Sequence, residues 1–181
     1  GNILVAGSIT DVSTEWDFAV ARWSSAGVLD TGFGTSGVAR INVSSSAVDE
    51  AYAMAIQPDG KIVLAGYAYV GSKQYFALVR LTTAGVLDST FGTGGKVTTA
   101  IGPNNNDRAS AMALLPDGRI VLAGTCHNGN DFDICVARYL SNGSLDTQFN
   151  STGKRVLPGD GTKNEYGRAV AVQNDSKIVI A

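Results

Sequence analysis

Apolar and polar positions along the chain follow a pattern that returns after about 58 residues, with turn signals in register. The stretch from Gln57 to Gly66 reads QPDGKIVLAG, and the stretch from Leu115 to Gly124 reads LPDGRIVLAG. Asp-Gly between two apolar runs is a strong β-hairpin signal, because glycine accepts the positive φ that such a turn requires. The chain is therefore a repeat array in which each motif joins two strands.

Each unit predicts four short strands. The run after the Asp-Gly turn is rich in Ile, Val and Leu, which is typical of a strand covered on both faces. No stretch keeps a helical period. We therefore predict an all-β fold, whose second unit has strands at residues 50–56, 61–68, 75–81 and 96–101.

The first strand of each unit alternates small residues with larger ones. A period of two places all the small residues on one face, and alanine is a poor strand former, so its recurrence needs a packing reason. Sheets crowded around a common axis supply that reason, which favours a β-propeller with blades of four antiparallel strands. The small residues are Ala51, Ala53 and Ala55, then Ala109, Ala111 and Ala113, and finally Gly167, Ala169 and Ala171.

The repeat boundaries predict one array over residues 1–181. We expect a first blade at 1–43 with three strands and no inner strand, complete blades at 48–101 and 106–159, and the first two strands of a fourth at 165–181. Propellers have about four to eight blades. The expectation is therefore part of a larger ring, completed by residues outside this sequence or by a partner chain.

A second motif recurs between the third and fourth strands, as in LDSTFG around Asp88. We expect its aspartates, Asp30, Asp88 and Asp146, to cap turns through backbone N–H groups. Calcium binding is the alternative, although the further acidic ligands of a calcium loop are missing. Arg22, Arg80 and Arg138 close the third strands, and we expect ion pairs with the recurring aspartates rather than a ligand-binding ring.

Together these motifs resemble the delta-60 repeat family of bacterial propeller-type repeats. The resemblance rests on PDGKIVLAG, on FALVRL from Phe76 and on LDSTFGTGGKV from Leu87. It implies a propeller fold and an extracytoplasmic setting, and it brings no catalytic residues. The departures are Ser176 and Asn150 in place of turn glycines, and Pro158, which indicates an edge position or an early end for the third unit's fourth strand.

Cys126 and Cys135 occur in the third unit alone, where the second unit has Ala68 and Ala77. An alanine pair replaced by cysteines at facing positions of adjacent strands indicates a cross-strand disulfide, in agreement with an oxidising compartment. Two buried thiols or half a metal site are the alternatives. A zinc site needs four convergent ligands, and His127 is the one histidine in the sequence, so we predict no metal.

The loops between second and third strands differ among the units, and in repeat proteins function lies where units differ. Aromatic and polar side chains there could hold a sugar or a peptide. The alternative is that the aromatic residues pack between blades. The candidate ligand-binding residues are Trp16, Tyr69, Tyr75, His127 and Asp131.

Composition excludes several classes of function. The net charge is −2, so no basic field is available to collect nucleic acid. Apolar runs are far shorter than the roughly 20 residues of a membrane span. We find no nucleophile–base pair, no paired carboxylates and no phosphate-binding loop, and we predict no cofactor and no catalysis.

Three hypotheses for function remain. The first is a secreted or surface-exposed module for binding or adhesion through rim loops, with a glycan or protein ligand at the cell surface. The second is a scaffold that self-associates through open blade edges. The third, the least favoured, is a glycan-acting enzyme that uses the propeller channel.

Overall fold

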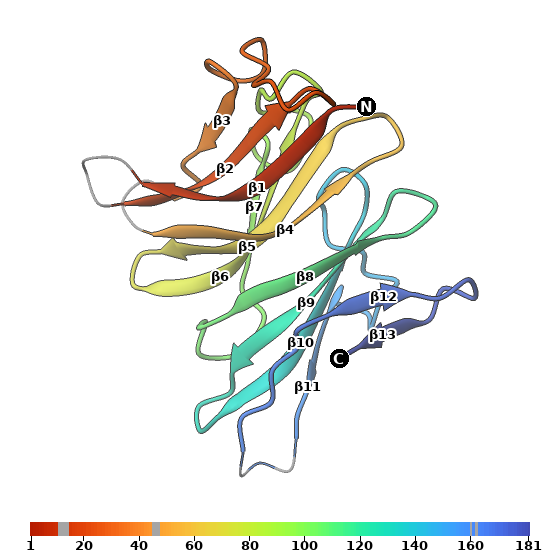
Figure 1. Cartoon of the computed structure of the whole chain (residues 1–181). Helices are drawn as coiled ribbons and strands as arrows, with labels where there is room; N and C mark the ends of the chain where they lie inside the picture. Colours follow the sequence, from red (N-terminus) through yellow and green to blue (C-terminus); the bar gives the residue numbers. More distant parts are fainter. Residues whose placement is uncertain (11–14, 45–47, 160, 162) are drawn as a thin grey trace.

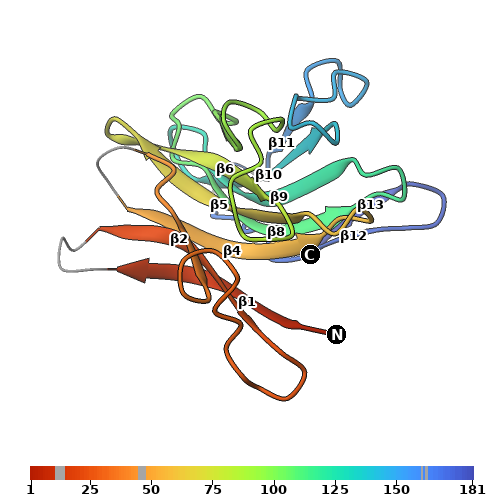
Figure 2. The same cartoon turned by 90° about the horizontal axis from the view of Figure 1, so that it is seen from above.

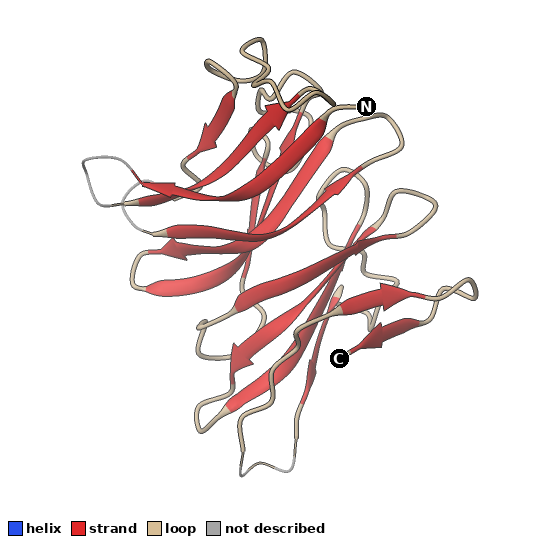
Figure 3. Cartoon of the chain, in the orientation of Figure 1, coloured by secondary structure: helices blue, strands red, loops and turns tan. Residues whose placement is uncertain are grey.

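The computed structural model describes residues 1–10, 15–44, 48–159, 161 and 163–181. Within them the fold consists of strands and loops without a helix, which confirms the all-β prediction (Figure 3). The strands are β1 Ile3–Thr10, β2 Trp16–Trp23, β3 Val38–Ile41, β4 Asp49–Ile56, β5 Ile62–Val70, β6 Lys73–Leu81, β7 Lys96–Thr99, β8 Arg108–Leu114, β9 Ile120–His127, β10 Phe132–Tyr139, β11 Lys154–Leu157, β12 Val170–Val172 and β13 Ile178–Ile180.

These strands form antiparallel sheets in chain order (Figure 1). Two sheets have four strands, in the orders β4-β5-β6-β7 and β8-β9-β10-β11. The sheet β1-β2-β3 precedes them and the hairpin β12-β13 follows. We call the four sheets the first to fourth blades. β11 ends at Leu157, immediately before Pro158, at the same repeat position where β3 and β7 end, so the proline does not shorten this strand.

The hairpin between β5 and β6 is tighter than the sequence predicted. The two strands pair as far as Val70 and Lys73, so Tyr69 lies within β5, where a loop is predicted, and Tyr75 lies inside β6 rather than at its first residue. Tyr69 is opposite Gln74 and Tyr75 is opposite Ala68. The prediction placed the turn too widely because aromatic residues next to glycine and serine were assigned to the loop.

The predicted alignment of small residues along the inner strands is wrong. The pairing of β4 with β5 shifts register between Ala51 and Ala53, and β8 has the same irregularity between Ala109 and Ala111. A bulge inserts one residue and reverses the alternation of faces beyond it. Ala51 consequently packs in the core shared with the first blade, whereas Ala53 packs towards the third.

A glycine opposite each bulge makes this close approach possible. Gly66 is paired with Ala51, and a Cβ added at Gly66 would lie 1.8 Å from the carbonyl oxygen of Glu50. Gly124 has the same relation to Arg108, at 2.0 Å. Glycine inside a strand often marks such a backbone contact. The glycine that ends each Leu-Ala-Gly sequence is therefore required because the bulged inner strand passes too close to it for a side chain.

Successive blades bury three hydrophobic cores between them. Along β5, Ile62 and Leu64 belong to the core shared with the first blade, and Val63 and Ala65 to the core shared with the third. A third core, which includes Val121 and Val136, lies between the third blade and the β12-β13 hairpin. The predicted strand covered on both faces is therefore present.

The blades meet along their inner edges. β4, β8 and β12 pack against one another in succession, whereas the outer strands β3, β7 and β11 contact neighbouring sheets little. The sheets follow one another from the N-terminal strands to the C-terminal hairpin in Figure 1, and they overlap when seen from above (Figure 2). This radial arrangement of blades is that of a propeller.

Polar bonds repeat between adjacent blades. An arginine near the end of β2 or β6 donates to a carbonyl of the following blade. A lysine at the start of β7 or β11 donates to a carbonyl of the preceding blade. The bonds are Arg22 Nη1 to Thr83 O at 2.6 Å, Arg80 Nη1 to Ser141 O at 2.5 Å, Lys96 Nζ to Asn42 O at 2.5 Å and Lys154 Nζ to Ala100 O at 2.8 Å.

Candidate functional site

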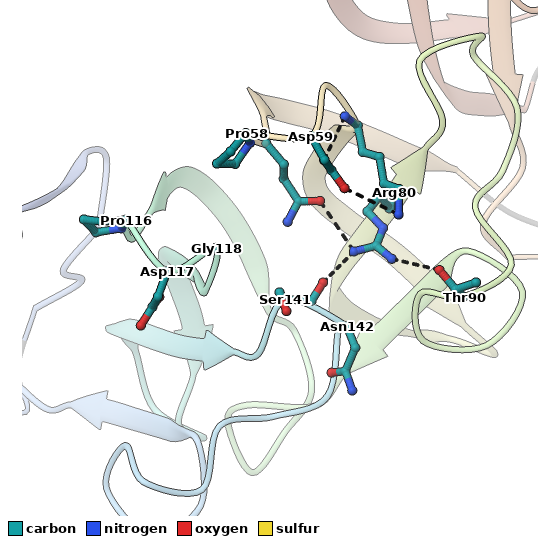
Figure 4. A pocket seen from close by; sticks show the side chains of 11 residues that line it. Pro58, Asp59, Arg80, Thr90, Pro116, Asp117, Gly118, Ser141 and Asn142 are labelled. Carbon is teal, nitrogen blue, oxygen red and sulfur yellow. Dashed lines mark hydrogen bonds and ion pairs between the residues drawn. The ribbon is translucent and has the colours of Figure 1, made fainter.

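The hollow in Figure 4 lies between the Pro-Asp-Gly turns of the second and third blades, beside Arg80. The Arg80 guanidinium donates to Asp88 Oδ2 at 2.8 Å, to Ser141 O at 2.5 Å and to Thr90 Oγ1 at 3.1 Å. Lys61 Nζ is 3.1 Å from the same aspartate oxygen. Since partners within the protein take up these polar groups, the hollow is a joint between blades rather than a ligand site.

The three recurring aspartates have the geometry of turn caps. Thr90 donates to Asp88 Oδ1 through its backbone N–H at 3.1 Å and its hydroxyl at 2.7 Å. The Thr90 hydroxyl, followed by Lys61 and Arg80, holds the pKa of Asp88 well below its usual range. Asp30 and Asp146 accept from the N–H groups of Gly32 and Gln148, and they pair with Arg22 and Arg138.

No set of three metal-ligating side chains occurs in the part of the chain that the structure describes. Each recurring aspartate instead has an arginine as its charged partner, at 2.7–2.8 Å from Nε to Oδ2. Charge-assisted bonds of this kind leave the carboxylates poorly suited to calcium.

Cys126 and Cys135 form a disulfide between β9 and β10. The sequence predicts that the two cysteines face each other directly on adjacent strands, but in the structure they do not. Cys135 is opposite Gly124, two residues before Cys126, so the bridge runs diagonally between adjacent strands with the Cα atoms 5.9 Å apart. That separation is normal for a disulfide, and both residues are fully buried.

The five predicted rim residues do not form one site. Trp16 begins β2 and is 43 % exposed on the first blade. Tyr75 is half-buried within β6. Asp131 is buried and accepts a hydrogen bond from the Asn128 side chain, so it fastens its own loop. Tyr69 and His127 alone belong to the aromatic groups described below.

A cleft of about 520 Å³ opens where the inner strands of three successive blades begin. We call it the mouth cleft. It takes one side chain from β4, two from β8 and two from the segment before β12, and the remainder from β9, from the start of β10 and from the residues before β8. Its lining residues are Tyr52, Asn106, Arg108, Ser110, Thr125, Phe132, Tyr166 and Arg168.

Aromatic rings flank the mouth cleft on two sides. On one side the ring of Tyr67 lies 6.0 Å from both Tyr52 and Tyr69. On the other side Phe132 stacks on Tyr166 at 6.1 Å and meets the edge of His127 at 4.9 Å, all between ring centroids. Tyr52 and Tyr166 are 52 % and 44 % exposed, so part of each outer ring remains open to a ligand.

Two arginines lie over these rings. The Arg108 guanidinium carbon is 5.0 Å from the Tyr67 ring centroid, and that of Arg168 is 5.1 Å from the Tyr166 ring centroid. The Arg108 Nε also donates to Gln74 Oε1 at 2.8 Å. Cation–π contact and this hydrogen bond hold the planar groups in place beside the mouth cleft.

Glu50 joins two of these rings through hydrogen bonds. It accepts hydrogen bonds from the hydroxyls of Tyr52 at 2.5 Å and Tyr67 at 2.9 Å. Burial, with the Glu50 carboxylate as second cause, raises the pKa of Tyr52 to about 12 and that of Tyr67 further still. Both phenols therefore remain protonated donors at neutral pH.

In each complete blade, a buried aspartate accepts hydrogen bonds from backbone N–H groups of the segment that precedes the inner strand. Asp49 accepts from the N–H groups of Val43 and Ser44 at 2.7 and 2.8 Å, and Asp107 accepts from Ile101 N–H at 2.7 Å. Both carboxylates are fully buried. Burial raises the pKa of Asp49, and it raises that of Asp107 to about 6.

The mouth cleft was missed at the sequence level. Glu50, Arg108 and Tyr166 occupy one repeat position, and Tyr52, Ser110 and Arg168 occupy another. This variation was the available signal, because repeat units that differ in chemistry at one position point to function. The alternation of alanines drew attention to the constant positions of the same strands instead.

Comparison with protein families agrees with the architecture. A family model described as a domain of unknown function, DUF5122, beta-propeller, matches residues 1–33, 57–91 and 115–149, more than half of the chain. The chain belongs to this family. The three matched DUF5122 segments agree with the resemblance to delta-60 repeats. A search for similar curated proteins finds no match.

Each matched DUF5122 segment begins near a hairpin turn and ends at the phenylalanine of the LDSTFG motif. The starting positions of the inner strands, which supply the mouth cleft, fall outside the matched segments. Two lining residues of the mouth cleft, Thr125 and Phe132, lie within the matched segment 115–149, and the other six lie outside the matched segments. No helix among the described residues is long and apolar enough to cross a bilayer.

Proposed function

We propose that the protein is a non-catalytic binding module that holds a glycan in the mouth cleft. The observation that carries the proposal is the joining of partly exposed tyrosine rings with arginine, hydroxyl and amide groups in one cleft. Aromatic faces pack against the apolar faces of sugar rings, and polar groups around them bind the hydroxyls. The cleft volume of about 520 Å³ falls in the range of small-molecule sites.

The chemistry of the lining supports binding rather than catalysis. Among the described residues that line the mouth cleft there is no carboxylate, histidine or cysteine. Two such groups that contact the aromatic rings of the cleft have other hydrogen bonds. Glu50 is hydrogen-bonded by two tyrosines, and His127 Nδ1 accepts the backbone N–H of Gly129 at 3.1 Å. General acid–base chemistry is most often carried by such groups when they lie within reach of the ligand.

An extracellular or cell-surface setting, with adhesion as the wider role, completes the proposal. The disulfide between Cys126 and Cys135 supports it, since disulfides persist in oxidising compartments. A module on the outside of a cell would meet glycans of other cells or of a matrix.

A glycan array followed by titration tests the proposal. Tyr52→Ala and Tyr166→Ala are each expected to weaken binding of the glycan that the array selects by about tenfold, because each removes one stacking surface. Trp16→Ala is the matched control, since Trp16 has a similar exposure but lies on the first blade. Equal binding by all three variants, with unchanged melting temperatures, would contradict the proposal.

One observation favours a second candidate function, assembly between copies through the edge of β1. In its sheet β1 has β2 as its partner on one side, and a Cβ added at Gly7 meets no atom within 4 Å. Gly7 stands at the repeat position of Gly66, where a bulged inner strand packs closely. We therefore propose that an inner strand of a second copy can pair here. Light scattering that gives a monomer at every concentration would exclude this assembly.

A further inference from the structure

We infer that the mouth cleft selects acidic glycans, and that Arg108 and Arg168 bind the carboxylate of a uronic acid residue. This inference rests on the proposed function and goes further, because it names the class of sugar and the residues that choose it.

Most arginines in the protein have an acidic partner. Each of these forms an ion pair with an aspartate: Arg22, Arg40, Arg80, Arg119 and Arg138. Among the described residues, none accepts a hydrogen bond or ion pair from the side chain of Arg168 or from the terminal nitrogens of Arg108. Both of these arginines line the mouth cleft.

The contacts that Arg108 and Arg168 do make hold them without using their terminal donors. Arg108 donates to Gln74 through Nε, which leaves both terminal nitrogens for a ligand. Arg168 lies over the Tyr166 ring, and it is an exposed residue. A planar guanidinium with two free N–H groups matches the geometry of a carboxylate.

The rings and charges together fit one kind of ligand. Stacking on Tyr52 or Tyr166 suits a pyranose ring, and a uronic acid carries its carboxylate on that ring. The phenols of Tyr52 and Tyr67 engage Glu50, the acidic group closest to the rings among the contacts described above. The chain as a whole has a net charge of −2, so attraction of an anion has to come from this local pair.

Calorimetric titration of the intact chain tests the inference with trigalacturonate and its fully methyl-esterified form. The two probes share their sugar rings and differ in charge. We expect trigalacturonate to bind at least tenfold more tightly, and we expect its affinity to fall as salt is raised. Arg108→Gln and Arg168→Gln should each weaken trigalacturonate binding by about tenfold, or about 1.4 kcal/mol, and should leave the ester unaffected.

Arg155→Gln is the control, because Arg155 is an exposed arginine on the outer strand β11, away from the cleft. Equal binding of acid and ester would overturn the carboxylate inference and leave the glycan proposal in place. Failure of both probes, together with an empty glycan array, would overturn the proposed function itself. Tighter binding of a tetraglutamate peptide than of trigalacturonate would replace the sugar with an acidic peptide and overturn the inference. The comparison of wild-type affinities decides the question even where an arginine variant does not fold.

Discussion

The close approach of β4 to Gly66 predicts that a single methyl group there is costly. In Gly66→Ala the new Cβ would lie 1.8 Å from the carbonyl oxygen of Glu50. An ordinary contact between a Cβ and a carbonyl oxygen needs more than about 3 Å. The backbone of β4 must therefore move by roughly 1 Å or more to relieve the clash. The obstacle is backbone rather than a flexible side chain, and β4 is held on its other face by the neighbouring blade.

The expected magnitude follows from two opposing effects. Overpacking of this kind costs about 1–3 kcal/mol, and the rigid obstacle places Gly66→Ala near the upper end. Alanine also restricts the unfolded chain, which offsets about 0.4–1 kcal/mol. We expect a net loss of about 2 kcal/mol, measured by urea unfolding followed with far-ultraviolet circular dichroism. Gly124→Ala should behave alike, because its Cβ would lie 2.0 Å from the Arg108 carbonyl.

Gly7→Ala is the matched internal control. Gly7 ends the same sequence motif in β1, but no atom lies within 4 Å of its added Cβ. We expect a change within about 0.5 kcal/mol of wild type, or a slight gain. Similar losses in Gly7→Ala and Gly66→Ala would show that the motif glycine is required by the strand itself. In that case the argument from the bulge would be wrong.

Three further predictions concern charge and covalent structure. Burial raises the pKa of Asp107 from 3.8 to about 6, so the native carboxyl holds its proton more tightly than the unfolded one. Stability should therefore fall as pH rises from about 4 to about 6, and Asp107→Asn should flatten this slope in urea unfolding at a series of pH values. Asp88→Asn should cost about 3 kcal/mol, because it leaves the buried Arg80 guanidinium without its charged partner. Asp30→Asn, at a more exposed site, should cost less than about 1 kcal/mol, and equal losses would contradict the role of burial. Reduction should add about 2 mass units and lower stability by about 2–3 kcal/mol, and the double variant Cys126→Ala/Cys135→Ala should match the reduced protein in thermal melts.

The strand order and turns could be predicted because their signals are local. Asp-Gly at residues 59–60 fixes one hairpin, and the apolar run after it contains Ile62 and Val63, which contact different cores. A fixed repeat period then carries the assignment to the other units. The disulfide pair followed from comparison of equivalent positions, although its diagonal register depends on strand pairing that spacing alone does not give.

The bulge and the mouth cleft could not be predicted by the same route. An alternating strand with one extra residue reads like an uninterrupted one, and Gly66 inside an apolar strand was the sole local sign of a close approach. The cleft depends on three inner strands lying side by side, with Tyr52, Arg108 and Arg168 drawn from different units. Their distance along the sequence hides the relation until the blades are packed.

The bonds between blades have a consequence for how such arrays grow. The arginine donors of the third strands reach acceptors 61 residues further along the chain, and the lysine donors of the fourth strands reach acceptors 54 residues back. A gene duplication that copies one whole cassette of about 58 residues leaves every such donor with an equivalent acceptor. A duplication of any other length would leave donors facing the wrong groups. The bonding scheme thus favours lengthening by complete cassettes, after which single residues such as Tyr52 and Arg168 are free to diverge.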